Sequence, residues 1–153
     1  MLQELILREA EERDLPEIIR LLSEDELESS REFLSNPLLK SYQVAFQEIM
    51  EDKHQMLCVL EYRDHIIGTC HLTVIPYLSF KGSRRLNIED FHVDKRVQGQ
   101  GIGTWMMQKA ISIGREKRCK IIQLTTNKSR SNAITFCKDL GFKATHEGMK
   151  LYL

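Results

Sequence analysis

The chain has 153 residues, and its 22 lysines and arginines balance its 22 aspartates and glutamates, so the formal net charge is zero. This length suits one domain with a proper core, and the neutral balance argues against broad electrostatic binding to nucleic acid, although it allows a local basic patch. The four cysteines show no CxxC pair and no zinc spacing, the first residues do not resemble a signal peptide, and no apolar run could span a membrane. We therefore expect a cytoplasmic enzyme or binding module that holds no metal.

The pattern of apolar residues predicts strands and helices along the whole chain. In chain order the predicted elements are a strand at Leu5–Arg8, a helix from Leu15 to Leu22, a helical region from Phe33 to Met50 interrupted near Asn36-Pro37, a hairpin of strands 56–62 and 66–75, a loop at 76–83, a strand at Arg85–Val93, a helix from Ile102 to about Arg118, a strand at 121–125, a helix at 132–140 stopped by Gly141, and two final strands within 142–153. This order predicts a mixed α/β (α+β) sheet with helices on its faces, in a single domain over residues 1–153.

Three alternating glycines, Gly99, Gly101 and Gly103, lie between the predicted strand and the predicted helix. Backbone N–H groups in the first turn of a helix have no intrahelical partner and can bind an anion. A dinucleotide fingerprint would need glycine at Thr104, and a Walker loop would need Gly-Lys-Ser/Thr, so neither fits. The glycines either shape a loop or bind a phosphate-bearing ligand, and their place between strand and helix favours the ligand.

A longer pattern resembles a known family. Gln98-Gly99-Gln100-Gly101-Ile102-Gly103 matches every position of Gln/Arg-x-x-Gly-x-Gly/Ala, the acetyl-CoA-binding motif of the GNAT N-acetyltransferase superfamily. The segment from Arg130 to Phe142 resembles the later helix of that family, which often ends in Tyr-x-x-x-Gly-Phe. The segment from Arg8 to Leu15 resembles its opening, so the resemblance covers nearly the whole chain.

This resemblance implies a central, mostly antiparallel sheet of about seven strands with a splayed parallel pair, Arg85–Val93 and Ile121–Thr125, flanked by about four helices. It implies acetyl-CoA as cosubstrate, with the pantetheine arm along the backbone of Phe91, His92 and Val93. The pyrophosphate is then expected on the N–H groups of Gln98, Gly99, Gln100, Gly101, Ile102, Gly103 and Thr104. Arg130 and Asn132 would contact the pantetheine or phosphate region, or else are a solvent-facing arginine and a helix cap.

The activity implied is acetyl transfer to a primary amine, either of a small molecule such as a polyamine or of a protein. The amine must lose a proton, and a carboxylate on the strand before the turn is the natural base. Glu89 is the first candidate for base or amine-binding group and Asp90 the second; as neighbours on a strand they are expected to face opposite sides of the sheet. Cys137 stands where the family has its proton-donating tyrosine, and is either that donor or an inert buried thiol.

Two other functions stay open. A non-catalytic acyl-CoA-binding or regulatory module would explain the missing tyrosine. A nucleic-acid-associated regulator would use a local basic set, Lys81, Arg84, Arg85, Lys95 and Arg96, but the neutral charge and the lack of a DNA-binding motif argue against it, so no nucleic-acid or membrane partner is expected.

The acceptor pocket should lie between the first two predicted helices and the loop at 76–83. Acidic residues there, Glu24, Asp25, Glu26 and Glu28, either attract a cationic amine or form a solvated charged face. His71 and His92 are expected to be structural or to line the substrate site. Family habit suggests a homodimer, formed through the C-terminal strands.

Overall fold

A computed structural model of the chain describes residues 1–24 and 31–153. They form two compact units, Met1–Gln123 and Leu124–Leu153. The strands are β1 (Leu5–Glu9), β2 (Gln55–Tyr62), β3 (His65–Pro76), β4 (Arg84–Val93) and β5 (Cys119–Leu124). The helices are α1 (Leu15–Leu22), α2 (Lys40–Glu51), α3 (Ser79–Gly82), α4 (Ile102–Glu116) and α5 (Ser131–Asp139). Within the described residues, no helix is both long and apolar enough to cross a membrane.

The strands form one open sheet in the order β1-β2-β3-β4-β5. The first four strands pair antiparallel with their neighbours. Helix α4 carries the chain from β4 to β5, which is the kind of crossover that parallel neighbours require. The predicted hairpin is confirmed: Arg63 and Asp64 connect β2 to β3, and both have positive φ, as a tight primed turn needs.

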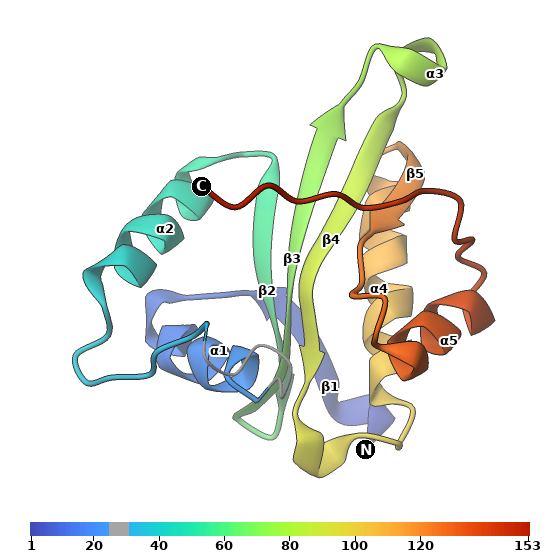
Figure 1. The fold of residues 1–153 in the computed structure, drawn as a ribbon. Coiled ribbons are helices and arrows are strands. Elements are labelled where there is room, and N and C mark those ends of the chain that lie inside the picture. Colours follow the sequence, from blue (N-terminus) through green and yellow to red (C-terminus); the bar gives the residue numbers. More distant parts are fainter. Residues whose placement is uncertain (25–30) are drawn as a thin grey trace. The chain divides into compact units, whose positions relative to one another are not determined.

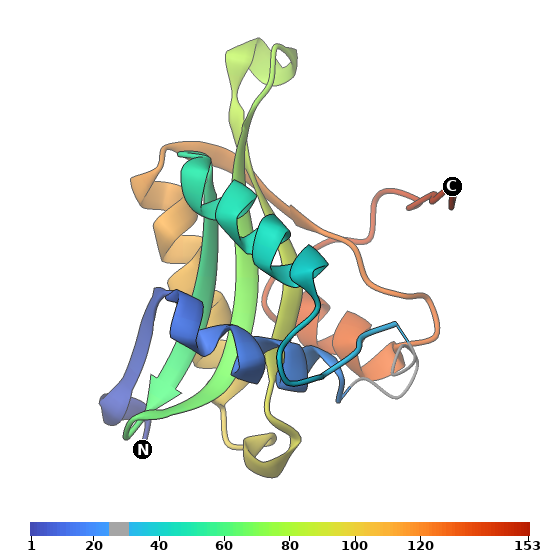
Figure 2. The same cartoon turned by 90° about the vertical axis from the view of Figure 1, so that its left-hand side faces the viewer.

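Helices α1 and α2 cover one face of the sheet, and α4 lies on the other (Figure 1). Figure 2 shows the first two helices lying over the strands. The core on that face joins buried side chains of both helices to β2: Ala10, Leu15, Ile18, Phe46, Leu57 and Val59. Leucine, isoleucine and phenylalanine side chains that leave water in this way supply most of the favourable free energy of folding.

The α1 segment folds much as its sequence predicts, since Pro16 occupies the first turn and four apolar side chains face the sheet. Asp14 does not cap α1 with its side chain. Its carboxylate instead accepts a hydrogen bond from the Glu11 N–H and forms an ion pair with Arg8 on β1, at 2.7 Å. The pKa of Asp14 is lowered, because these contacts outweigh the opposing effect of its burial.

The expected counts of about seven strands and four helices are wrong: the described residues hold five of each. Residues 142–153 contain no strand, because alternating side chains predict a strand only where a neighbouring strand can bond to it. The segment 76–83, expected as a loop, contains the short helix α3. The helical region expected from Phe33 is a helix only from Lys40 onward. Of the acidic residues expected to attract an amine, Asp25, Glu26 and Glu28 lie outside the described residues.

Candidate functional site

Strand β4 contains a bulge at Asp90 and Phe91. On β3, Thr69 pairs with His92 and His71 pairs with Glu89, so two residues of β4 lie opposite the single residue between Thr69 and His71. Asp90 has φ of 51°, a left-handed conformation that aspartate tolerates better than most residues. A non-glycine residue held in this conformation at a bulge often marks a functional site.

The bulge changes which side chains of β4 face the core. Before it, Leu86 and Ile88 are buried, and after it Val93 is buried, so the alternation shifts by one residue. The expectation that Glu89 and Asp90 face opposite sides assumed an unbroken strand, and the bulge removes that premise. Both side chains are exposed.

Glu89 is held by a chain of hydrogen bonds that crosses from β5 to β4. Asn87 Nδ2 donates to Glu89 Oε1 at 3.2 Å, and Gln123 Nε2 donates to Asn87 Oδ1 at 3.5 Å. Arg85 Nη1 donates to Gln123 Oε1 at 3.3 Å and starts the chain. Because arginine only donates and a carboxylate only accepts, both amides in between have a fixed orientation.

His71 lies directly opposite Glu89 on β3, on the face covered by α1 and α2, since its other neighbour in register is the core residue Leu57. His71 Nε2 is 2.7 Å from Gln55 Oε1 on β2. Burial lowers the pKa of the half-buried His71, and the carboxylates of Asp90 and Glu89 only partly oppose this effect. The ring is therefore neutral at neutral pH.

Asp90 sits among other charges. Loss of hydration raises the pKa of its carboxyl although the side chain still touches solvent, and the carboxylates of Glu89 and Glu32 raise it further. His71 and Arg31 act in the opposite direction. Glu89, Asp90 and His71 thus form a cluster of ionisable side chains, and its two carboxyl groups suit a cation.

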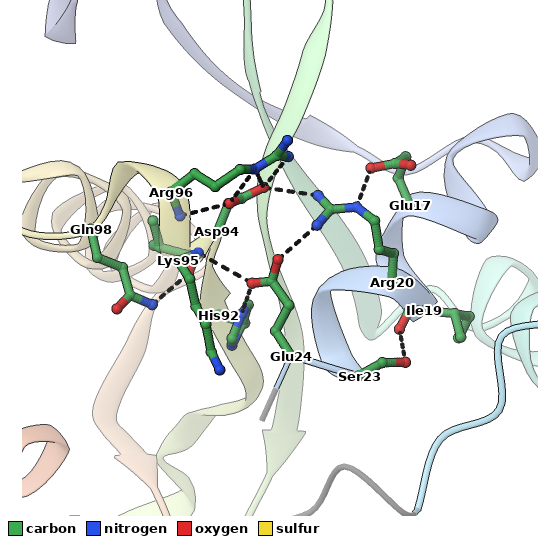
Figure 3. A network of polar contacts seen from close by, with 11 residues as sticks. Glu17, Ile19, Arg20, Ser23, Glu24, His92, Asp94, Lys95, Arg96 and Gln98 are labelled. Atoms are coloured by element: carbon green, nitrogen blue, oxygen red, sulfur yellow. Dashed lines mark hydrogen bonds and ion pairs between the residues drawn. The ribbon is translucent and has the colours of Figure 1, made fainter. Parts of the chain in front are cut away.

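Charged residues fix the end of β4 (Figure 3). Asp94, only 1% exposed, accepts hydrogen bonds from Arg20 at 2.9 Å and from Arg96 at 2.6 Å. Hydrogen bonds from Arg96 hold the pKa of Asp94 far below its usual range, although burial alone would raise it. This ion pairing connects α1 to the residue that follows β4.

Glu24 extends the same network. Its carboxylate accepts from Arg20 Nη1 at 2.7 Å and from the Lys95 N–H at 3.2 Å, and it is 2.9 Å from His92 Nε2 (Figure 3). Burial alone would raise the pKa of Glu24, but the contacts with His92 and Lys95 outweigh it and the pKa is lowered. The His92 side chain therefore makes a structural contact, which is one of the two roles that the sequence left open.

The glycine turn, residues 98–104, follows a short 3₁₀ turn at Lys95–Val97. Gly99 and Gly101 have φ of 79° and 78°, and a Cβ added at either would meet no atom of the described part of the chain within 4 Å. Their backbone conformation requires glycine, whereas the space beside them is open. Gln98 joins this turn to β4, since its Nε2 donates to the Val93 carbonyl at 2.8 Å.

Helix α4 starts from this turn, and no side chain of residues 1–24 or 31–153 caps its N-terminus. Ile102 is buried, so it anchors the helix and can offer a ligand only its N–H. Gln100 is exposed, whereas Gly103 and Thr104 are half-buried. Uncapped N–H groups, the positive end of the helix dipole and an open approach together suit a phosphate, and so fit the pyrophosphate of acetyl-CoA.

The second unit contains the remaining predicted site residues. Arg130 is the N-cap residue of α5, where its N–H donates to Asn127 O at 2.9 Å, and Asn132 lies in the first turn. The Cys137 carbonyl accepts from the Leu140 N–H at the end of this helix. Burial raises the pKa of the Cys137 thiol, so this side chain stays protonated at neutral pH.

Sequence reasoning missed several residues that organise the site. Gln55, Asn87 and Gln123 belong to no motif, and only the strand register brings them beside His71 and Glu89. The sole signal for the bulge is that aspartate tolerates left-handed backbone. Among residues 1–24 and 31–153, no three His, Cys, Asp or Glu side chains gather as a metal site would require.

The chain matches a known protein family and is similar to several known proteins. Residues 6–142 match the model of the acetyltransferase (GNAT) family. A transcriptional regulator from Bacillus halodurans C-125 is similar in structure, with a TM-score of 0.94, 41% identity and coverage of 97% of this chain and 99% of that chain.

Two curated enzymes are similar in sequence. The glucosamine 6-phosphate N-acetyltransferase of Trypanosoma brucei brucei is 29% identical over 145 residues, 88% of this chain and 95% of that protein. The thialysine N-epsilon-acetyltransferase of Bos taurus is 28% identical over 150 residues, 90% of this chain and 83% of that protein. Because the family match covers most of its length, the chain belongs to the acetyltransferase (GNAT) family.

Proposed function

We propose that this protein is an acetyl-CoA-dependent N-acetyltransferase, acting as one catalytic domain over residues 1–153. The observation that carries the proposal is the glycine turn, with two glycines at positive φ beside an uncapped helix and open space where a ligand would lie. Acetyltransferases of this family use acetyl-CoA, and the two curated relatives acetylate amines. The acceptor is accordingly a primary amine of a small molecule or a protein.

In this proposal the N–H groups of residues 98–104 bind the pyrophosphate, and the backbone of residues 91–93 lies along the pantetheine arm. Acetyl-CoA supplies an activated thioester that an amine can attack directly. A backbone N–H near His92 or Val93 would polarise the thioester carbonyl. Cofactor contacts of Arg130 and Asn132, proton donation by Cys137, a homodimer and a cytoplasmic location stay predictions.

Glu89 binds the acceptor as an ammonium ion. Its carboxylate is oriented by Asn87 and lies beside Asp90, so the pair presents negative charge at the strand before the turn. An ionised carboxylate attracts a cationic amine and holds it by charge-assisted hydrogen bonds. We therefore assign Glu89 to amine binding rather than to the base role that the sequence left open.

A regulatory role is the second candidate, favoured by the similarity to the Bacillus halodurans transcriptional regulator. The local basic set gives it little support. Arg96 is paired with Asp94, and the guanidinium of Arg85 stacks on the rings of Tyr77 and Phe80 at 4.0 and 5.4 Å. Fluorescence anisotropy with a mixed-sequence DNA duplex tests it: salt-sensitive binding by the whole protein would favour this role.

The enzyme assay follows acetyl-CoA consumption against polyamines, amino acids, aminoglycosides, peptides, glucosamine 6-phosphate and thialysine, with mass spectrometry of the product. We expect at least one primary amine to be acetylated. Acetyl-CoA binding without turnover of any amine would favour the non-catalytic module instead. Absence of acetyl-CoA binding at millimolar ligand would contradict both.

A further inference from the structure

His71 lies in a row of residues across the centre of the sheet. Its register partners are Leu57 on β2 and Glu89 on β4. Its ring contacts Gln55 on the β2 side, and the carboxylates of Glu89 and Asp90 act on it from the β4 side. A neutral imidazole thus lies between an amide and the two acidic groups proposed to bind the amine.

The contacts of Gln55 determine which nitrogen of His71 carries the proton. The Asp52 carboxylate accepts from Gln55 Nε2 at 2.9 Å and from the His54 N–H at 2.8 Å. These hydrogen bonds lower the pKa of Asp52, so its ionised carboxylate can only accept. The amide nitrogen of Gln55 must therefore face Asp52, and its oxygen must face His71.

An amide oxygen only accepts hydrogen bonds, so His71 Nε2 must donate to it. In the neutral ring the other nitrogen, Nδ1, then carries a lone pair. The chain Asp52–Gln55–His71 thereby fixes a tautomer with a free proton acceptor. This hydrogen-bonded arrangement resembles the way an acidic partner orients a general base in other enzymes.

The charges around His71 suit a reversible proton acceptor. On β2 its partner Gln55 is uncharged, with Asp52 behind it; on β4 it faces Glu89 and Asp90, and Glu32 and Arg31 act on Asp90. Burial keeps the ring unprotonated before reaction, and the nearby carboxylates stabilise the imidazolium that forms.

We propose that His71 Nδ1 accepts the proton of the acceptor amine, with Gln55 and Asp52 as positioning residues. The inference rests on the proposed acetyltransferase function. An ammonium ion held by Glu89 passes one proton to Nδ1, and the lone pair released on its nitrogen forms the N–C bond to the acetyl carbon. The C–S bond breaks, and the sulfur keeps its electron pair and takes the second amine proton. Nδ1 later releases the first proton to water.

The first test needs no activity. Nitrogen-15 NMR of the whole protein, labelled on histidine, reports which ring nitrogen bears hydrogen. We expect the Nε2–H form for His71 and a change to a tautomer mixture in Gln55→Leu. A predominant Nδ1–H form in the wild-type protein would overturn the proposal, whatever the protein acetylates.

The second test uses the pH dependence of kcat/KM with an amine found in the panel. The value of kcat/KM should fall at low pH as His71 becomes protonated. Gln55→Glu should move this acidic side of the profile to higher pH by about 1 pH unit, because a carboxylate beside Nε2 raises the pKa of the ring. His71→Asn should lower kcat/KM by about 100-fold or more, with acetyl-CoA affinity retained. The exposed His65, changed to Asn, is the matched control.

The outcomes separate the two proposals. Suppose that the wild-type protein acetylates an amine while His71→Asn leaves kcat/KM unchanged and Gln55→Glu leaves the acidic side of the pH profile unchanged. In that case the proposal for His71 is wrong and the acetyltransferase function stands. If no amine is acetylated, the function fails, and the NMR result alone decides whether His71 is preset as an acceptor. Circular dichroism of each variant confirms that a lost rate is not a lost fold.

Discussion

The glycine turn and the His71–Glu89 pair are built in opposite ways. The turn acts through its backbone, so its requirements appear in the sequence as glycines at the positions of positive φ. The pair acts through side chains from neighbouring strands, and no spacing in the sequence brings His71 opposite Glu89. A site made by backbone conformation is therefore easier to find in a sequence than one made by strand register.

Asp94 follows β4 and pairs with Arg20 of α1 and with Arg96, and changing it should have the largest effect on stability. Asp94→Asn leaves Arg20 and Arg96 facing a buried amide, so we expect a loss of about 3 kcal/mol in the free energy of unfolding. Urea unfolding followed by circular dichroism measures it. Arg63→Ala, which removes an exposed ion pair with Glu4 and a ring contact with Tyr62, should have little effect. Equal losses would contradict a structural role for Asp94.

The same residue predicts a pH dependence. The pKa of Asp94 is lower in the folded protein than in the unfolded chain, so its contribution is present at neutral pH. It should be lost as the pH falls below the ordinary aspartate value of about 3.9. The free energy of unfolding should be measured from about pH 6, above the reference aspartate pKa, to lower pH. Asp94→Asn should lose less stability in acid than the wild-type protein, and parallel curves would contradict the assignment.

Glu89 should matter for turnover and little for folding. Removing its charge in Glu89→Gln should lower kcat/KM by about 10- to 100-fold, because a charge-assisted hydrogen bond to the amine is lost. Acetyl-CoA affinity should stay unchanged. Glu116→Gln, at an exposed position near the end of α4, serves as the control. An equal loss of acetyl-CoA affinity would contradict the assignment of Glu89 to amine binding.

Asp90 should show stability and activity moving in opposite directions. Asp90→Gly relieves the left-handed backbone at the bulge, so the protein should gain about 1 kcal/mol. Turnover should fall, since the bulge then carries no charge. Asp90→Asn removes the charge but keeps a side chain that tolerates this backbone conformation, so it separates loss of charge from relief of strain. A Gly variant that is less stable than the wild-type protein would contradict backbone strain at the bulge.

Much of the fold was predictable, because buried stripes and alternation mark helices and strands directly. The strand before the turn was placed within one residue of β4, and the helix after it begins at Ile102 as expected. The bulge at Asp90 was not predictable, because a bulge depends on the neighbouring strand. The two final strands were wrong for a related reason, since alternation does not supply a pairing partner.

The candidate site was likewise predictable only in part. The motif located the turn, and Glu89 was named from its position, yet its partner Asn87 and the role of His71 depend on contacts across the sheet. Gln98 shows the limit within the motif itself. Its side chain binds the Val93 carbonyl, so only its backbone is available to a phosphate in this arrangement.

Calorimetric titration with acetyl-CoA tests the central claim most directly. Gly101 and Gly82 have nearly equal φ, 78° and 74°, so alanine at either should cost about 1–2 kcal/mol of backbone strain. We predict that the wild-type protein binds acetyl-CoA, that Gly101→Ala weakens binding by about tenfold, and that Gly82→Ala, in α3, leaves it unchanged. No binding by the wild-type protein, or equal losses in both variants, would contradict a cofactor site at the glycine turn.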